Sequence, residues 1–263
     1  MNFFHIILHF FLFFILLLED QAKIPTAQPG RIIGGDDAVI GQFPFAAAIH
    51  VQTSDSKFFC GGAILSREWI LTAGLCVYKA VLFTIQLGSN DLATSDGNRV
   101  IVATSDWVVH PDFNPDTIEH DIGLIKLRMP IIYNVFIQPI NMPTVVLSEN
   151  SSVTILGWGQ TSDSDPQLSE SLQFQKVSIL SNEECRLYYG NQITENMVCV
   201  EGNYNEGTCI GDNGSPLAQY LSLYKWVGGV ASFISANGCE STEPSGFTRI
   251  FPYIDWIKNI TDI

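Results

Sequence analysis

Two polar side chains, one that can pair with a cation and one that can form hydrogen bonds, are adjacent in the segment 209–216. This segment reads Cys-Ile-Gly-Asp-Asn-Gly-Ser-Pro. A glycine stands on each side of the Asp212–Asn213 pair, and this pattern predicts a tight, rigid turn between regular elements. The Asp212 carboxylate can pair with a cation there. The Asn213 carboxamide is not a nucleophile that can form an acyl-enzyme, so the turn is not expected to support covalent catalysis.

A second carboxylate, Asp121, opens the segment Asp-Ile-Gly-Leu and follows His120 directly. Histidine is the commonest proton-transfer group in enzymes, and a neighbouring carboxylate can orient its ring. Successive side chains of an extended strand point to opposite faces, however, so His120 and Asp121 are not expected to act as a pair. His50 and His110 are interpreted as ordinary strand or loop residues.

The composition favours a β protein that carries these groups on its loops. The chain has 263 residues, of which 46% are apolar and only 15% charged, with 21 glycines and 12 prolines. This length suits one large domain or two small ones. The net charge of −14 argues against nucleic acid and anionic membranes as partners, because both require clustered lysine and arginine.

Short apolar runs separated by Gly, Asp, Ser and Asn clusters predict the strands of a sandwich or barrel. These runs are 45–51, 60–65, 69–73, 81–87, 100–103, 152–157, 172–179, 225–233 and 246–250. Ser181 and Glu184 match a capping box and predict a short helix to about Tyr189. Apolar residues at helical spacing between Tyr253 and Ile260 predict a C-terminal amphipathic helix.

The N-terminus has the pattern of a targeting signal. Residues 3–18 are apolar except for two histidines, and the run is short for a membrane span. We interpret 1–22 as a signal peptide, with a signal anchor as the alternative, and 23–31 as an extended pro-segment. The mature chain is therefore expected to be secreted and extracellular, without membrane attachment.

Six cysteines in a secreted chain predict three disulfides, although the sequence alone leaves their pairing open. Metal binding by the cysteines is the alternative, and it is disfavoured because the chain has no Cys-x-x-Cys pair. The loop 89–98 contains Asp91 and Asp96 but lacks the ligand spacing of an EF-hand, so we interpret it as a solvated loop. We predict no metal and no cofactor.

Five motifs together resemble the trypsin/chymotrypsin family of serine peptidases. The turn 209–216 resembles the family's nucleophile loop, Gly-Asp-Ser-Gly followed by a small residue and proline. The segment 71–76, Leu-Thr-Ala-Gly-Leu-Cys, resembles Leu-Thr-Ala-Ala-His-Cys, and 121–124 resembles Asp-Ile-Ala-Leu. Arg31-Ile-Ile-Gly-Gly resembles the family's activation site, and 157–159, Gly-Trp-Gly, matches a loop near its pocket. The motifs occur in the family's order across 32–263.

The resemblance implies an all-β fold of two antiparallel six-stranded β-barrels, chymotrypsin-like, with a cleft between them and a C-terminal helix. The N-terminal barrel would cover about 32–135 and the C-terminal barrel about 136–263. The resemblance also implies the disulfides Cys60–Cys76, Cys185–Cys199 and Cys209–Cys239.

In the family a serine attacks the peptide, a histidine transfers the proton and an aspartate orients the histidine. The resemblance places these roles at 213, 75 and 121, where this chain has Asn213, Leu75 and Asp121. Leucine cannot accept a proton, and loss of the triad costs on the order of 10⁶ in kcat in a related enzyme. We therefore expect a catalytically inactive homologue, in which Ser232 and backbone N–H groups support Asp121.

The resemblance assigns roles to further residues. A cut after Arg31 would free the amino group of Ile32 to pair with Asp212. The backbone N–H groups of Gly211 and Asn213 would form an oxyanion hole. The pocket residues, implied by the brachyurin (collagenase-type) branch of the family, are Gly207, Ser232, Ile234 and Ser245. They carry no charge, so the implied preference is for apolar or small side chains.

Asn150 and Asn259 open glycosylation sequons in segments that we expect to be exposed, whereas the sequon at Asn213 lies in the folded cleft and is not expected to carry a glycan.

These observations predict a secreted, non-catalytic serine peptidase homologue, monomeric, that binds a peptide, an inhibitor or a partner protease. One alternative is a weak or altered chymotrypsin-like endopeptidase that uses His120 or a water molecule. A regulatory cofactor of an immune protease cascade is less favoured, because residues 1–31 lack the cysteines of an upstream module. The two aspartates could instead have a purely structural role, and the cleft could be vestigial.

Overall fold

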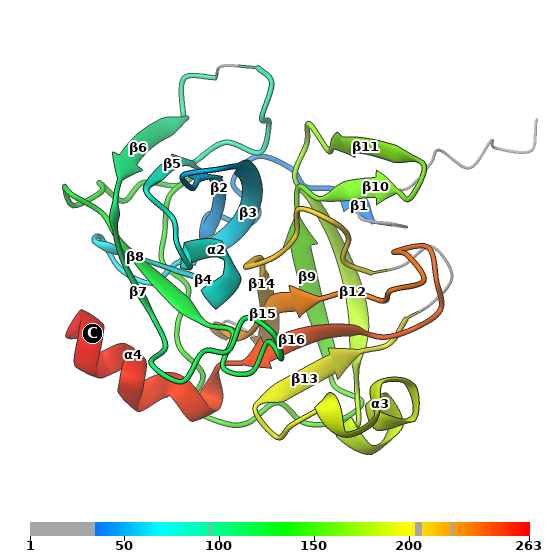
Figure 1. Cartoon of the computed structure of the whole chain (residues 1–263). Helices are drawn as coiled ribbons and strands as arrows, with labels where there is room; N and C mark the ends of the chain where they lie inside the picture. The colour runs from blue at the N-terminus through cyan, green and yellow to red at the C-terminus, as the bar shows by residue number, and fades with distance from the viewer. Residues whose placement is uncertain (1–34, 95, 203–206, 222–223) are drawn as a thin grey trace, which may run out of the picture.

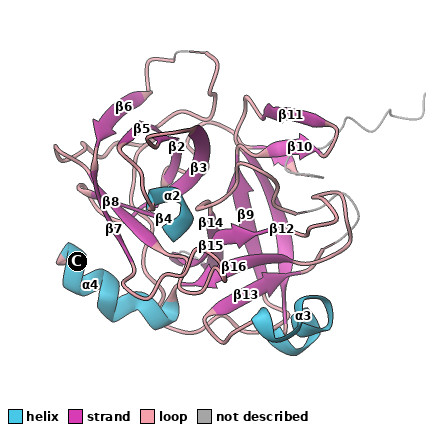
Figure 2. Ribbon diagram, in the orientation of Figure 1, coloured by secondary structure: helices cyan, strands magenta, loops and turns pink. Residues whose placement is uncertain are grey.

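The computed structural model describes residues 35–94, 96–202, 207–221 and 224–263. The predicted signal peptide (1–22), the pro-segment (23–31) and the activation residues Arg31 and Ile32 lie outside these ranges. Two antiparallel sheets make up most of the described chain, one from each half of the sequence. The helices α3 (Asn182–Tyr189) and α4 (Ile254–Thr261) lie at the periphery (Figures 1 and 2).

The first sheet is built from the N-terminal half. Its strands are β2 (Ala46–Gln52), β3 (Lys57–Ile64), β4 (Trp69–Thr72), β5 (Leu82–Leu87), β6 (Val100–Thr104), β7 (Asp106–Val109) and β8 (Gly123–Lys126). They lie in the order β6-β5-β2-β3-β4-β8-β7, and every pairing is antiparallel. The sheet curls strongly (Figure 1), with β6 and β7 as its two ends.

The second sheet closes on itself. Its strands are β9 (Ser152–Gly157), β12 (Gln173–Leu180), β13 (Met197–Val200), β14 (Pro216–Leu221), β15 (Tyr224–Phe233) and β16 (Ser245–Arg249). They form a six-stranded barrel, because β9 pairs with β14 on one side and with β12 on the other. The short strand β1 (Asp36–Asp37) joins β12, and β10 (Gln160–Ser162) pairs with β11 (Asp165–Leu168).

The predicted all-β class and two-barrel architecture are therefore confirmed, with one refinement. Six strands close into a barrel only in the second sheet, since the seven-stranded order of the first ends at β6 and β7. Curling lets the first sheet bury one face without a closed ladder, because adjacent strands in a sheet twist by roughly 20–25°.

Both predicted helices are present. The helix α3 (Asn182–Tyr189) begins with the expected capping box: the Ser181 hydroxyl accepts from Glu184 N at 3.1 Å, and Ser181 N donates to the Glu184 carboxylate at 3.3 Å. The helix α4 (Ile254–Thr261) follows a 3₁₀ turn, η2 (Phe251–Tyr253). A one-turn helix, α2 (Gly74–Val77), and a 3₁₀ turn, η1 (Gly190–Gln192), complete the elements. In the described ranges, no helix combines the length and apolarity needed to span a bilayer.

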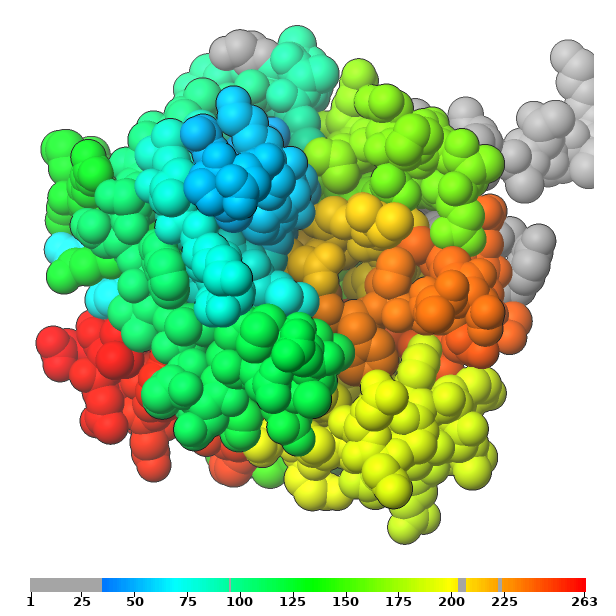
Figure 3. Space-filling model, in the orientation of Figure 1, coloured from blue at the N-terminus to red at the C-terminus, as the bar shows by residue number. Residues whose placement is uncertain are grey.

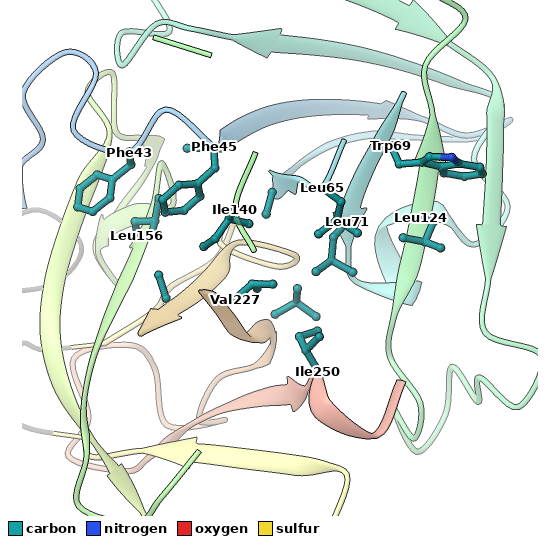
Figure 4. Packing of buried hydrophobic residues seen from close by; sticks show 14 of the residues in the cluster. Phe43, Phe45, Leu65, Trp69, Leu71, Leu124, Ile140, Leu156, Val227 and Ile250 are labelled. Carbon is teal, nitrogen blue, oxygen red and sulfur yellow. The ribbon is translucent and has the colours of Figure 1, made fainter. Parts of the chain in front are cut away.

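A shared hydrophobic core fixes the two sheets against each other. Leu71 and Leu124 of the first sheet belong to the same buried cluster as Leu156 and Val227 of the second. Figure 4 shows these side chains of the cluster together with Ile250, which lies close to Leu71 and Val227 in this view. Burial of each such side chain stabilises the fold by roughly 1.5–3 kcal/mol. This shared cluster positions the loops where the two sheets meet.

The three disulfides implied by the resemblance are formed: Cys60–Cys76, Cys185–Cys199 and Cys209–Cys239. They link β3 to α2, α3 to β13, and the turn before β14 to the loop after β15. The Asp163 carboxylate lies near the sulfurs of Cys209 and Cys239. Those sulfurs are bonded to each other and cannot act as thiolate ligands, so this group is not a metal site.

Candidate active-site cleft

The segment 209–216 forms the tight turn that its glycines predicted. Asp212 N donates to Cys209 O at 3.0 Å, and Ser215 N donates to Asp212 O at 2.9 Å, which gives two overlapping turns. Gly211 and Gly214, the third residue of each turn, have φ of +99° and +79°. Positive φ at that position defines a type II turn, which glycine adopts without steric cost. A Cβ on Gly214 would also lie 2.1 Å from the Thr72 hydroxyl, so this glycine is required.

Asp212 is fully buried beneath this turn. Its Oδ1 accepts from Gly159 N at 2.8 Å and its Oδ2 from Cys209 N at 2.9 Å. Burial raises the pKa of the Asp212 carboxyl to about 6, and the two N–H donors oppose part of that rise. The expected partner, the amino group of Ile32, lies outside the described residues, so that pairing stays a prediction.

Asp121 is the second buried carboxylate, and its predicted support is confirmed. Its Oδ1 accepts from Leu75 N at 2.7 Å, and its Oδ2 accepts from the Ser232 hydroxyl at 2.6 Å. Gly74 N is a third donor. Burial raises the pKa of Asp121 to about 6, with these hydrogen bonds acting in the opposite direction. Strand β15 and helix α2 thus meet through this carboxylate.

Asn213 is tied to strand β15. Its side-chain Nδ2 donates to Ser232 O at 2.8 Å, and its own carbonyl accepts from Gly61 N at 2.8 Å. Ser232 therefore contacts both Asp121 and Asn213, one through its hydroxyl and the other through its carbonyl. The three positions at which the resemblance places the triad, 75, 121 and 213, are brought together around this serine.

A hollow of about 370 Å³ opens between the two halves of the molecule at this point (Figure 3). Its lining is mostly apolar and consists of Leu75, Ile118, Thr208, Cys209, Ile210, Asp212, Asn213, Ala231, Ser232, Phe233 and Ile234. A second hollow of about 230 Å³ shares Ile118, Phe233 and Ile234 with it and continues toward Tyr189 and Met197. Together the hollows form an apolar trough, which we call the cleft.

The predicted pocket residues divide into two groups. Ser232 and Ile234 line the cleft, whereas Gly207 and Ser245 are buried next to each other and do not reach it. Thr208 also lies in the lining, although it is not among the predicted pocket residues. Its hydroxyl is buried and has no hydrogen-bond partner among the described residues. The signal that could have revealed Thr208 is its position directly before Cys209 at the start of the turn.

His120 faces away from the cleft. Its Nδ1 lies 2.9 Å from the Tyr253 hydroxyl, and its ring stacks on His110 with centroids 5.0 Å apart and planes 12° apart. Tyr253 precedes α4, so this pair packs against the C-terminal helix. Among the described residues that line the cleft there is no histidine.

The two sequons expected to be accessible open at exposed asparagines. Asn150 lies in the turn before β9 with a φ of 58°, and Asn259 lies on the outer face of α4. Asn213 is partly buried and its amide is hydrogen-bonded. Glycosylation at Asn150 and Asn259 remains a prediction.

A cleft between two β-sheet halves, with buried aspartates and a glycine-flanked turn beside it, is the arrangement of the trypsin family of serine peptidases. The chain belongs to that family, because the family model named Trypsin matches residues 32–257. The chain is 35% identical to brachyurin of Leptuca pugilator over 232 residues, covering 88% of this chain and 99% of that protein. It is 36% identical to a collagenase of Hypoderma lineatum over 251 residues, covering 93% of each.

The fold comparison agrees with the sequence comparisons. A solved collagenase structure superposes with a TM-score of 0.79 at 35% identity and covers 88% of this chain and 99% of that one. The chymotrypsin-like fold is thereby established. Human chymotrypsin-like elastase family member 1 is also similar, at 32% identity over 238 residues, covering 88% of this chain and 92% of that protein.

Proposed function

We propose that this chain is a secreted serine peptidase homologue that binds a protein or peptide in its cleft without hydrolysing it. The observation that carries the proposal is the chemistry around Asp121: its described neighbours Leu75 and Ser232 supply hydrogen-bond donors, and Leu75 supplies no imidazole. At position 213 the cleft presents a carboxamide, whose nitrogen is hydrogen-bonded to Ser232. The Asn213 side chain cannot attack a carbonyl as a nucleophile, and the Leu75 side chain cannot accept a proton from an attacking group.

The known effect of triad loss on kcat supports the expectation that this chain does not hydrolyse peptides at a useful rate. Loss of the serine or the histidine of a triad reduces kcat by on the order of 10⁶. The residual acceleration over water, roughly 10³–10⁴, comes from the oxyanion hole and substrate binding. On this proposal, the backbone N–H groups of Gly211 and Asn213 can still form the oxyanion hole and bind a ligand, and Asp121 stabilises the fold.

The cleft also indicates what it would bind. Its lining is apolar, with Leu75, Ile118 and Phe233 exposed to it, so an extended segment with apolar side chains is favoured. A peptide, a protease inhibitor or a partner protease could present such a segment. Secretion, a monomeric state, cleavage after Arg31, pairing of Ile32 with Asp212, and the absence of nucleic-acid and membrane partners are part of the same proposal. The disulfides are consistent with an extracellular location.

The second candidate is a serine-type endopeptidase of weak or altered activity with apolar specificity. The chain's membership in the trypsin family favours this candidate, and so does its similarity to brachyurin and collagenase. The position of His120 disfavours an endopeptidase, because its ring is hydrogen-bonded to the Tyr253 hydroxyl and stacked on His110.

Peptide turnover separates the two candidates. The chain, cut after Arg31, is incubated with a mixed peptide library beside the double variant Leu75→His, Asn213→Ser and the single variants. We expect the double variant to cut after apolar residues and the native chain and both single variants to remain inactive. Binding of unlabelled peptides to the native chain is followed by calorimetry. Native turnover that Asp121→Ala abolishes would refute the proposal.

A further inference from the structure

Asparagine is followed directly by glycine at two positions of the chain, Asn213–Gly214 and Asn237–Gly238. In such a pair the backbone nitrogen of the glycine can attack the side-chain carbonyl carbon of the asparagine, because the glycine has no side chain to block the approach. A nitrogen held by a strong hydrogen bond reacts slowly, because that bond has to break first. The surroundings of the two pairs therefore decide which of them reacts.

The first pair is held at both reacting groups. Asn213 Nδ2, which would leave, donates to Ser232 O at 2.8 Å. Gly214 N, which would attack, donates to Ala231 O at 2.8 Å. Gly214 is buried, and the Thr72 hydroxyl fills the space beside its Cα. Attack requires both hydrogen bonds to break inside a packed turn, so we expect this pair to be stable.

The second pair lies in the loop that follows β15. Asn237 is exposed and Gly238 is half-buried. Gly238 N lies 3.3 Å from Ser235 O, which is beyond the usual range of about 2.7–3.2 Å for such a hydrogen bond. The attacking nitrogen is thus weakly held, and water can reach the asparagine.

Two carboxylates flank the second pair. Glu243 accepts from Asn237 Nδ2 at 2.9 Å. Asp163 lies against Gly238, where a Cβ would be 2.3 Å from its Oδ2. A carboxylate beside a reacting N–H group can accept the proton, as a general base does. The loop therefore orients the carboxamide of Asn237 and places a proton acceptor next to the glycine.

We propose that Asn237 is a site of spontaneous deamidation, whereas Asn213 is protected from it. Gly238 N forms a bond to Asn237 Cγ, the bond from Cγ to Nδ2 breaks, and Nδ2 leaves as ammonia with the proton of the glycine amide. Water then opens the resulting succinimide ring at either carbonyl, which gives aspartate or isoaspartate. Water is the only co-reactant that these steps need.

Deamidation changes the charge at the contact that closes the loop. The amide donor that Asn237 offers to Glu243 becomes a second carboxylate, and like charges at hydrogen-bond distance repel each other. Ser235 connects the same groups, since its Oγ accepts from Asn237 N at 2.9 Å and donates to Glu243. The loop 235–243 should therefore open when Asn237 is deamidated.

This loop also borders the cleft. Ala236, the residue before Asn237, lines the second hollow of the cleft. Cys239 is bonded to Cys209, which lines the first hollow. An opened loop changes the wall that a bound segment contacts. That consequence for binding rests on the proposed function, whereas the deamidation itself does not.

Ageing of the full secreted chain in water enriched in heavy oxygen tests the proposal. The chain is incubated at mildly alkaline pH, digested in acid and mapped by mass spectrometry. Heavy oxygen should enter residue 237 about tenfold or more faster than residue 213, because the hydrogen bonds at Asn213 and Gly214 have to break first. In the reduced chain unfolded in urea, where those bonds are absent, the two rates should agree within about threefold.

Asn237→Gln is the matched control, and it should lose the signal at 237, because its longer side chain closes a ring far more slowly. Equal rates at the two sites of the folded chain would overturn the proposal. So would the absence of heavy oxygen at residue 237 of the folded chain when both sites react in urea.

Asn237→Asp gives the deamidated side chain directly and provides the second arm. The backbone N–H groups of 237–240 should exchange with deuterium about threefold or more faster than in the native chain. Combining this change with Glu243→Gln should restore native exchange, because a glutamine amide can donate to the new carboxylate. Circular dichroism confirms folding of each variant.

Native exchange in the folded Asn237→Asp variant would show that deamidation does not open the loop, and this part of the proposal would be wrong. Neither arm measures binding or turnover in the cleft, so failure of this proposal is distinct from failure of the proposed function.

Discussion

The Asn213 carboxamide donates a 2.8 Å hydrogen bond to the backbone carbonyl of Ser232, and the Ser232 hydroxyl donates in turn to Asp121. This chain of contacts joins the 209–216 turn, strand β15 and the loop before β8. Strand β15 borders the cleft with its residues 231–233. The Ser232 carbonyl beside the cleft is already hydrogen-bonded in the free protein, so a ligand N–H that binds to this carbonyl competes with Asn213 for its lone pairs.

Asn213→Ala is expected to release that carbonyl. A hydrogen bond of this kind contributes about 0.5–1.5 kcal/mol, so the variant should unfold at slightly lower denaturant concentration. It should bind an apolar cleft peptide, such as succinyl-Ala-Ala-Pro-Phe-amide, about two- to tenfold more tightly. Calorimetry and urea titration measure the two effects. Weaker peptide binding by the folded variant would show that the Asn213 side chain contacts the ligand itself.

Two substitutions of Asp121 separate the effect of losing its hydrogen bonds from the effect of losing its charge. Asp121→Ala leaves the Leu75 N–H and the Ser232 hydroxyl without their acceptor, and we expect destabilisation of about 2–5 kcal/mol. Asp121→Asn keeps an acceptor in nearly the same shape. Comparing both variants by urea denaturation tests a structural role, and equal stability of the alanine variant and the native chain would contradict it.

The pH dependence of Asp121 follows from its pKa. Burial raises that pKa from 3.8 to about 6, so between pH 4 and 6 the folded state binds more protons than the unfolded state. The free energy of unfolding contributed by this group therefore falls as the pH rises through that range. Relative to the native chain, Asp121→Asn should gain about 2–3 kcal/mol between pH 4 and pH 8. A difference that does not change with pH would be inconsistent with a raised pKa.

Cleavage after Arg31 should stabilise the protein through Asp212. At pH 8 that buried carboxylate is ionised with backbone donors as its described partners, which is costly. Pairing with the new amino group of Ile32 should raise the Tm by about 5 °C or more. Calorimetry before and after the cut measures this. Asp212→Asn serves as the control, since its Tm should not rise on cleavage.

Protonation of His110, whose ring stacks on His120, should destabilise the protein in acid. Burial, and secondarily the neighbouring His120, lower the pKa of His110 below 6.5. A depressed histidine pKa favours folding at neutral pH, and this contribution is lost as the pH falls below about 6.5. Its sign is opposite to that of Asp121. His110→Phe retains packing against Tyr253 and Trp256, so its stability should depend less on pH between 5 and 7. An unchanged pH profile would exclude this role.

The Thr208 hydroxyl should be dispensable for the fold. It is buried, and no residue that the structure describes is its hydrogen-bond partner; an unsatisfied buried group of this kind costs about 1–3 kcal/mol. Thr208→Val keeps the volume and removes the hydroxyl, so it should be more stable than the native chain in urea. If cleft ligands hydrogen-bond to this hydroxyl, the same variant should bind them less tightly. A less stable valine variant would indicate a hydrogen bond to water in solution.

Local features were predictable from the sequence. The capping box of Ser181 and Glu184, the α4 helix and the 209–216 turn depend on residues close in the chain, whose backbone preferences and spacing specify them. The disulfide pairs and the support of Asp121 by Ser232 followed from the family motifs, because those motifs carry long-range geometry with them.

Other features depended on the tertiary structure alone. The lining of the cleft by Thr208 rather than Gly207 and the stack of His110 on His120 both join residues from different strands or loops. Sequence spacing does not specify such contacts, because they arise from strand register and sheet curvature, which the shared core between the two sheets fixes. The residue types at 75, 121 and 213 were thus set by the sequence, whereas their meeting around Ser232 was decided by the packing of one sheet against the other.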